Sequence, residues 1–120
     1  MTPNYNLFYV EDTDRSRDFY AAILDRQPVD HSETFSVFVL PSGLKLGLWK
    51  KGGVEPAANQ PGGFELGFQV DNMAEVDRLA ADWTARGITL IQPLVDMDFG
   101  RTFTAIDPDG HRLRVLCLAA

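Results

Sequence analysis

A weak internal repeat constrains the fold of this chain more than any other feature of its sequence. Phe8-Tyr9-Val10-Glu11 matches Phe68-Gln69-Val70-Asp71 at an offset of 60 residues (68 − 8), and the same offset aligns Phe19 with Leu79 and Ile23 with Trp83. Later in each half, Leu40-Pro41-Ser42-Gly43 matches Asp107-Pro108-Asp109-Gly110 at an offset of 67 (107 − 40). Because the matches keep the same order in both halves, they indicate two copies of one supersecondary unit.

Each half predicts one strand, one helix and three further strands. The aromatic and β-branched residues at 5–10 and 65–70 favour strands. A helix that begins after Asp12 or Thr13 runs to about Leu24, and a second helix follows the capping-box-like pair Asn72 and Glu75, with Gly87 as its left-handed C-cap. The remaining strands are expected at 28–32, 35–40 and 44–50, and at 89–96, 101–107 and 111–118.

These elements predict an α+β fold of two pseudo-symmetric βαβββ modules within a single domain, 1–120. The modules cover residues 5–50 and 64–118. The segment 51–63 is rich in Gly, Pro and Ala and is expected to be a flexible linker outside either core. A length of 120 residues with 45% hydrophobic content suits one domain with a real core.

Charge and cysteine content exclude several function classes. A net charge of −6 argues against nucleic acid and against anionic membrane surfaces, since both would be repelled. Cys117 is the one cysteine and lies in an apolar run, which predicts a buried thiol rather than a nucleophile. The sequence has no apolar stretch near the ~20 residues of a membrane span and no signal-like start, so a cytoplasmic location is expected.

Alternation along the strands predicts a sheet face that points away from the helices. Two four-residue turns, Leu40 to Gly43 and Asp107 to Gly110, would place Phe38 opposite Lys45 and Phe103 opposite Arg114. The face is then expected to carry Tyr5, Phe38, Trp49, Glu65, Phe103 and Arg114. Rings with a few polar groups indicate a ligand pocket. An equally open alternative is that the same rings are buried in a dimer or fill the hollow of the sheet.

Two segments resemble the vicinal oxygen chelate superfamily, which includes glyoxalases, bleomycin-resistance proteins and extradiol dioxygenases. One runs from Val10 to Tyr20, a strand leading into a helix with Ser16 and Phe19-Tyr20, and the other is Asp107-Pro108-Asp109-Gly110-His111. The resemblance covers about residues 7–118. It implies that the two modules curl into a U-shaped mixed sheet around a central cavity, usually in a homodimer.

The same resemblance implies where its enzymes would hold a divalent metal. The four positions fall on Tyr5, Gly47, Glu65 and Arg114, of which only Glu65 is a metal ligand, so neither metal nor cofactor is expected. His31 and His111 are interpreted as solvated histidines at strand ends. Asp107 and Asp109 are interpreted as turn formers. No catalytic residue is predicted.

Within the superfamily, two segments are most similar to binding proteins that confer resistance to phenazine antibiotics: 98–103 followed by 107–111, and Leu48-Trp49 before a Gly-rich turn. This resemblance implies sequestration of a planar aromatic small molecule without its transformation. Trp49, Phe38 and Phe103 would stack on the ligand, Phe99 would close over it, and Arg114 would meet a ligand carboxylate or else pair with Glu65. The alternatives are a metal-dependent glyoxalase-like lyase or dioxygenase, and an interaction module whose sheet face serves only dimerisation.

Overall fold

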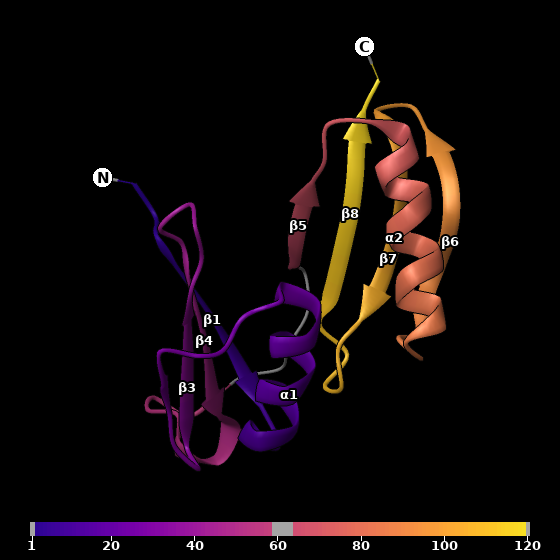
Figure 1. Cartoon of the computed structure of the whole chain (residues 1–120). Coiled ribbons are helices and arrows are strands. Elements are labelled where there is room, and N and C mark those ends of the chain that lie inside the picture. Colours follow the sequence, from indigo (N-terminus) through magenta and orange to yellow (C-terminus); the bar gives the residue numbers. More distant parts are fainter. Residues whose placement is uncertain (1, 59–63, 120) are drawn as a thin grey trace. The chain divides into compact units, whose positions relative to one another are not determined.

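The computed structural model describes residues 2–58 and 64–119 and divides the chain into two compact units, 1–61 and 62–120 (Figure 1). We call the first unit module one and the second unit module two. In the described residues, each contains one α-helix and one four-stranded sheet. The α+β class and the two βαβββ modules predicted from the repeat are therefore confirmed.

Module one consists of β1 (Tyr5–Val10), α1 (Thr13–Leu24), β2 (Asp30–His31), β3 (Phe35–Val39) and β4 (Lys45–Lys50). The strand order in its sheet is β1-β4-β3-β2, with β1 parallel to β4 and the other pairs antiparallel. The strand expected at 28–32 is reduced to two residues.

The helix of module one begins and packs as its sequence dictates. Asp12 is the N-cap, and its side chain accepts a hydrogen bond from the backbone N–H of Arg15 at 3.1 Å. The helix lies against β3 and β4. Between helix and sheet is the core of the module, formed by fully or almost fully buried side chains: Phe8, Val10, Tyr20, Phe38, Leu46 and Leu48.

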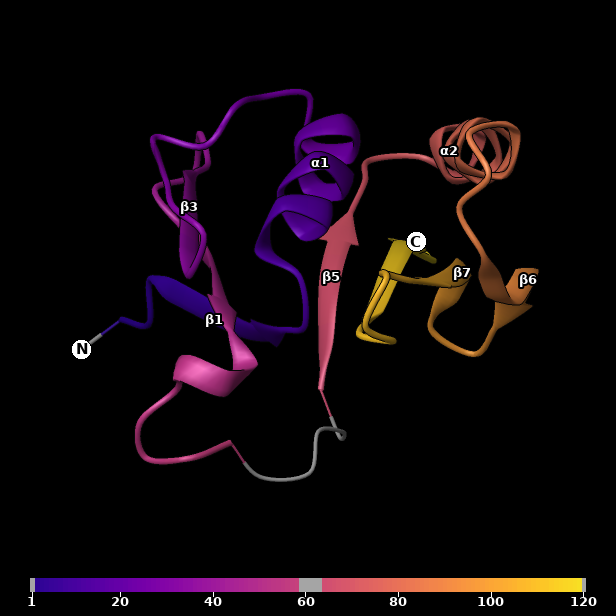
Figure 2. The same ribbon diagram turned by 90° about the horizontal axis from the view of Figure 1, so that it is seen from below.

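Module two repeats this arrangement with β5 (Glu65–Gln69), α2 (Met73–Ala85), β6 (Leu90–Met97), β7 (Gly100–Ile106) and β8 (Arg112–Leu118). Its sheet has the equivalent order β5-β8-β7-β6. Figure 2 looks nearly along α2 and shows this helix on one face of β6, β7 and β8, which it contacts.

The second helix has the predicted caps at both ends. The Asn72 side chain accepts a hydrogen bond from the Glu75 backbone N–H at 2.8 Å, while the Glu75 carboxylate pairs with Arg78 in place of a reciprocal capping box. Gly87 has φ +81° and ends the helix in the left-handed region. The core beneath is formed by Val76, Ala80, Trp83, Phe103, Ala105, Leu113, Val115 and Cys117. The prediction that Cys117 is buried is confirmed.

Both hairpin turns are one residue longer than predicted, which changes the face of two strands. In the first turn Leu40 donates its N–H to Leu44 at 2.9 Å, so three residues rather than two lie between the paired positions. Asp107 and His111 pair in the same way at 3.0 Å. Gly43 and Gly110 have φ +91° and +87°. A three-residue hairpin loop is usually a type I turn followed by one residue with positive φ, and these glycines occupy that position. The register therefore shifts by one residue in both hairpins.

The segment after β4, expected to be a flexible linker, is partly ordered and packed. A short 3-10 helix, η1 (Lys51–Gly53), follows the strand, and Val54 is only 5% exposed. The expectation that all of 51–63 stays outside the packed structure is wrong at Val54, and its residues 59–63 lie outside the described residues. Neither α1 nor α2 is long and apolar enough to cross a membrane.

Candidate functional site in the outer face of module one

The sheet of module one exposes an aromatic surface on the side opposite α1. It comes from alternate residues of β1 with two rings from β3 and β4. We call it the aromatic face and define it by Tyr5, Leu7, Tyr9, Phe35 and Trp49. Tyr5, Leu7 and Tyr9 are 41%, 45% and 41% exposed, although large apolar side chains at strand positions are usually covered. Exposed apolar side chains gathered on one face are typical of surfaces that contact a ligand or another protein surface.

Trp49 is the centre of the ring cluster. Its indole lies 6.3 Å from the Tyr9 ring and 6.4 Å from the Phe35 ring, in both cases nearly perpendicular, at 84° and 85°. Such edge-to-face contacts hold the half-buried indole from both sides. At the far end of the strands, Lys45 places its ammonium 5.7 Å from the centre of the Tyr5 ring, a cation–π contact.

Phe38 does not belong to this face, contrary to the sequence prediction. It pairs with Leu46, not Lys45, and is fully buried beneath α1. The one-residue shift in the Leu40 to Leu44 hairpin puts Phe35 opposite Trp49 instead. Sequence reasoning therefore missed Phe35. The signal that could have found it is the glycine at the fourth turn position, which permits the longer loop.

Phe103 is displaced for the same reason in module two. It pairs with Val115, not Arg114, and is fully buried, with its ring 5.4 Å from Trp83 of α2 in an edge-to-face contact. Phe103 is thus a core residue. Phe99 is half-buried in the turn between β6 and β7, and its carbonyl accepts a hydrogen bond from Ala119 at 2.9 Å. Closure of Phe99 over a ligand stays a prediction.

The corresponding face of module two carries a polar network centred on Arg114. Arg114 donates from Nε and Nη2 to the two oxygens of Glu65 at 2.8 and 3.0 Å. Its Nη1 donates to Gln92 Oε1 at 3.0 Å and to Thr102 Oγ1 at 3.2 Å. The same Gln92 oxygen accepts from Thr104 at 2.9 Å. Two roles are predicted for Arg114: contact with a ligand carboxylate, or an internal ion pair with Glu65. The structure shows the ion pair.

This pair shifts the protonation equilibria of both partners. The hydrogen bonds from Arg114 hold the pKa of the Glu65 carboxyl below its usual value, against the opposing effect of partial burial. The pKa of Arg114 is correspondingly raised, chiefly by its hydrogen bonds to Glu65. The carboxylate is therefore charged and already fully engaged near neutral pH.

The four positions that the resemblance implies for a metal do not fit one. Tyr5 holds a phenol beside Lys45, and Gly47 has no side chain. Both Glu65 oxygens accept hydrogen bonds from Arg114, a permanent cation. A catalytic zinc site needs about three protein ligands, and Mn, Fe or Ni sites likewise use His and carboxylate ligands. We therefore derive no chemistry through a metal at these positions.

Neither histidine is solvated in the way the sequence suggested. His31 bonds to Ser36 through Nδ1 and to Asp14 through Nε2 at 2.8 Å, and its side chain is 24% exposed. Because Ser36 is fully buried, this Ser-His-Asp set links β2 to α1 and does not present a nucleophile to solvent. His111 bonds through Nδ1 to Asp107 at 2.7 Å and is 16% exposed.

The segment from Asp107 to His111 also brings three possible metal donors within 4.8 Å of one another: Asp107, Asp109 and His111. Asp107 Oδ1 accepts from the backbone N–H groups of Asp109 and His111 at 2.9 and 2.8 Å, and its other oxygen accepts from His111. This side chain therefore stabilises the hairpin turn, as predicted.

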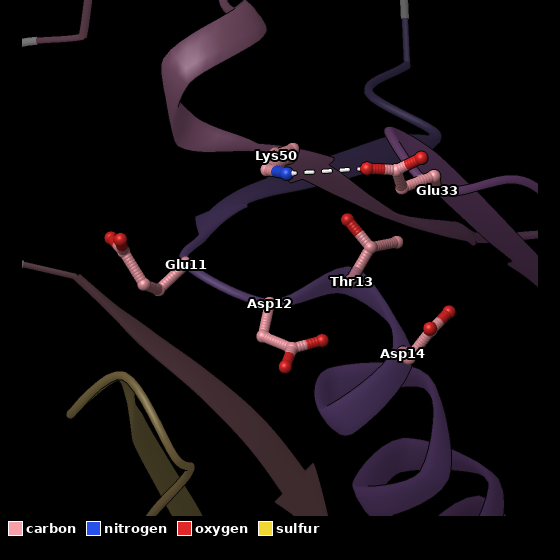
Figure 3. A pocket seen from close by; sticks show the side chains of 6 residues that line it. All are labelled: Glu11, Asp12, Thr13, Asp14, Glu33 and Lys50. Atoms are coloured by element: carbon pink, nitrogen blue, oxygen red, sulfur yellow. Dashed lines mark ion pairs between the residues drawn. The ribbon is translucent and has the colours of Figure 1, made fainter.

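A hollow of about 690 Å³ lies at the start of α1, lined by Glu11, Asp12, Thr13, Asp14, Glu33 and Lys50 (Figure 3). Asp12 caps the helix, Asp14 accepts from His31, and Lys50 lies 3.7 Å from Glu33. Figure 3 shows the Glu11 and Asp12 carboxylates pointing in different directions. Local structure accounts for Asp12, Asp14 and the Lys50–Glu33 pair, whereas the buried Thr13 Oγ1 has no hydrogen-bond partner among the described residues. We take the aromatic face as the candidate site because it exposes apolar side chains to solvent.

Comparison with solved structures shows the same fold in proteins of several bacteria. The solution NMR structure of protein ATC0852 from Agrobacterium tumefaciens is 48% identical, with a TM-score of 0.91 over 100% of this chain and 99% of that chain. A glyoxalase-related enzyme from Fulvimarina pelagi is 23% identical, with a TM-score of 0.82 over 94% of this chain and 85% of that one. The second likeness shows the fold alone.

Sequence comparison supplies the family. The phenazine antibiotic resistance protein EhpR of Enterobacter agglomerans is 37% identical over 119 residues, which cover 96% of this chain and 91% of the relative. The model of the glyoxalase/bleomycin resistance protein/dioxygenase superfamily matches residues 2–115. With two βαβββ modules of equivalent topology and a family match over nearly the whole chain, this protein belongs to the glyoxalase/bleomycin resistance protein/dioxygenase superfamily.

Proposed function

We propose that this chain is a binding protein that holds a planar aromatic small molecule, such as a phenazine antibiotic, and sequesters it without metal catalysis. The observation on which the proposal depends is the aromatic face of module one. Tyr9, Phe35 and Trp49 form a cluster of rings there that is not closed by the module's own helix. A planar ligand stacked on such a surface gains ~0.5–1.5 kcal/mol for each aromatic contact beyond the buried area.

The named relative supports the choice of ligand class. EhpR is called a phenazine antibiotic resistance protein, and this chain is 37% identical to it across nearly its full length. Phenazines are flat, apolar ring systems, and the aromatic face offers rings and one ammonium, that of Lys45, with no carboxylate among its defining residues. The chemistry of the face matches that class of molecule.

The donor chemistry supports binding over catalysis by a metal. Of the four positions implied by the family resemblance, only Glu65 supplies a carboxylate, and Arg114 engages both of its oxygens. A metal-dependent lyase or dioxygenase would need a different donor set at these positions.

Isothermal titration calorimetry with phenazine, a quinone and a non-planar apolar control tests this proposal. We expect saturable binding of the planar compounds and an affinity loss of at least about tenfold in Trp49→Ala, because the central ring is removed. Recovery of the ligand unchanged after prolonged incubation is expected as well. Stoichiometric metal in the purified protein together with turnover of an added planar substrate would overturn the proposal.

The resemblance also implies a homodimer, which we keep as a proposal beside the first. Light scattering after size-exclusion chromatography measures the assembly directly. If the aromatic face served only dimerisation, Trp49→Ala would dissociate the dimer and planar ligands would not bind to the wild-type protein. If it is a ligand site, the variant loses ligand and keeps its mass.

A further inference from the structure

Gly47 occupies the centre of the sheet of module one, on the side of the aromatic face. It lies on β4 midway between Lys45 and Trp49, with Leu7 of β1 and Val37 of β3 as its register partners. The residue is buried although it has no side chain. Something other than its own atoms must therefore cover it.

Three side chains fill the space that a side chain at this position would take. A Cβ built on Gly47 would lie 2.6 Å from Leu7 Cδ2, 2.9 Å from Tyr5 Cε1 and 3.0 Å from Phe35 Cζ. These atoms belong to β1 on one side and β3 on the other. Because Gly47 has no Cβ, all three side chains can pack directly against the backbone of β4.

The backbone gives no other reason for glycine at this position. Among the described residues, the glycines with positive φ are Gly43, Gly87, Gly100 and Gly110, and Gly47 is not one of them. Glycine in the interior of a strand reduces stability, and where it occurs it often marks a close approach by another group. Here the group that approaches is the aromatic face itself.

We propose that Gly47 is a selectivity-determining residue of the aromatic face. Because it has no side chain, Leu7, Tyr5 and Phe35 pack close to the backbone of β4, and the face is flat enough for a long, planar, fused-ring ligand to lie across it. This inference rests on the proposed function. From Lys45 to Trp49 the strand extends about 13 Å, a length that three fused rings span and a single ring does not. A methyl group at position 47 would lift Leu7, Tyr5 and Phe35 in the middle of that surface.

Displacement of these three side chains away from the sheet should weaken the binding of long ligands more than that of short ones. A tricyclic ligand loses contact with one end of the face, whereas a single ring that stacks on Trp49 alone stays in place. The three contacts are side-chain atoms rather than backbone atoms, namely one flexible leucine end and two ring atoms. We therefore expect Gly47→Ala to lower the stability of module one but to leave it folded.

Calorimetric titrations of wild type and Gly47→Ala with phenazine and with pyrazine test the inference. We expect the phenazine affinity of the variant to fall by about fivefold, the loss of one aromatic contact, and the pyrazine affinity to change less than about twofold. Gly67→Ala is the matched control, because Gly67 is a mid-strand glycine of module two with no atom within 4 Å of a built Cβ. Its affinities should equal those of the wild type.

A second variant separates ligand selectivity from a folding defect. Leu7→Ala removes the closest of the three contacts, so the double variant Leu7→Ala/Gly47→Ala should regain phenazine affinity relative to Gly47→Ala. No phenazine binding by the wild type would remove the proposed function itself. Binding by the wild type with equal losses for both ligands, or with no loss in Gly47→Ala, would overturn only the role of Gly47.

Discussion

Arg114 and Glu65 form a two-pronged ion pair that joins β8 to β5, with N–O distances of 2.8 and 3.0 Å. Further bonds from Arg114 to Gln92 and Thr102 satisfy the second terminal nitrogen of the guanidinium. A carboxylate position that the family resemblance assigns to metal binding is thereby used to hold a sheet together. The pair is partly exposed, so solvent screening limits its contribution to stability.

Removal of Arg114 should weaken module two by an amount that depends on pH. We expect Arg114→Met to lower the free energy of unfolding by about 1 kcal/mol at pH 7, after allowance for solvent screening. Because the folded-state pKa of Glu65 is depressed, its contribution is present above the unfolded pKa and is lost as the pH falls through the folded value. Urea unfolding at pH 7 and at pH 3 measures both quantities.

The matched control is Arg78→Met, which breaks the exposed pair with Glu75 within one turn of α2. This variant should change stability less than Arg114→Met at pH 7. Equal losses of unfolding free energy in the two variants, or an unchanged pH dependence of stability in Arg114→Met, would show that the Arg114–Glu65 pair contributes no more than an ordinary exposed ion pair.

Phe35 and Phe38 lie three residues apart on β3 and should behave in opposite ways. Phe38 is fully buried under α1, so Phe38→Ala should cost about 3–5 kcal/mol of unfolding free energy. Phe35 is half-buried against Trp49, so Phe35→Ala should cost clearly less but weaken planar ligands. Denaturant titration and calorimetry of the two variants give a direct comparison. A larger stability loss for Phe35→Ala would mean that the strand faces are assigned the wrong way round.

Much of this arrangement can be predicted from the sequence. The repeat predicts both modules, and alternation places β1, β4, β5 and β8 correctly because each carries apolar residues at every second position facing its helix. The faces of β3 and β7 depend instead on the length of the adjoining hairpin loop. That length depends on the conformation of Gly43 and Gly110, which a single sequence does not specify, and one residue of error moved Phe38 and Phe103 to the wrong face.

Beyond the alternative of an Arg114–Glu65 pair, the sequence also did not predict which side chains form hydrogen bonds with one another. The sequence places His31 at a strand end, but only the folded module brings it between Asp14, which precedes it by 17 residues, and Ser36. The same holds for Gln92 and Thr102, whose contacts with Arg114 depend on the register of β6 and β7. The U-shaped sheet and its central cavity stay a prediction.

The hairpin glycine can be tested through its backbone conformation. A Cβ on Gly43 would meet no atom within 4 Å, so Gly43→Ala is penalised only by the positive φ, and we expect a loss of about 1–2 kcal/mol. Gly43→Asn should cost less, because asparagine tolerates the left-handed region. Thermal unfolding of the two variants checks the order. Equal midpoints for Gly43→Ala and the wild type would contradict the loop geometry that sets the register.

The two tryptophans allow the central claim to be tested in one protein sample. Trp49 lies half-buried in the aromatic face, while Trp83 is 4% exposed in the core of module two between Phe68 and Phe103. In ¹H–¹⁵N spectra recorded during a phenazine titration, we predict that the indole Nε1–H signal of Trp49 shifts saturably and that of Trp83 does not. Trp49→Phe and Trp83→Phe assign the two signals. A Trp49 signal that stays in place at saturating phenazine, or one that shifts no more than Trp83, would contradict the account.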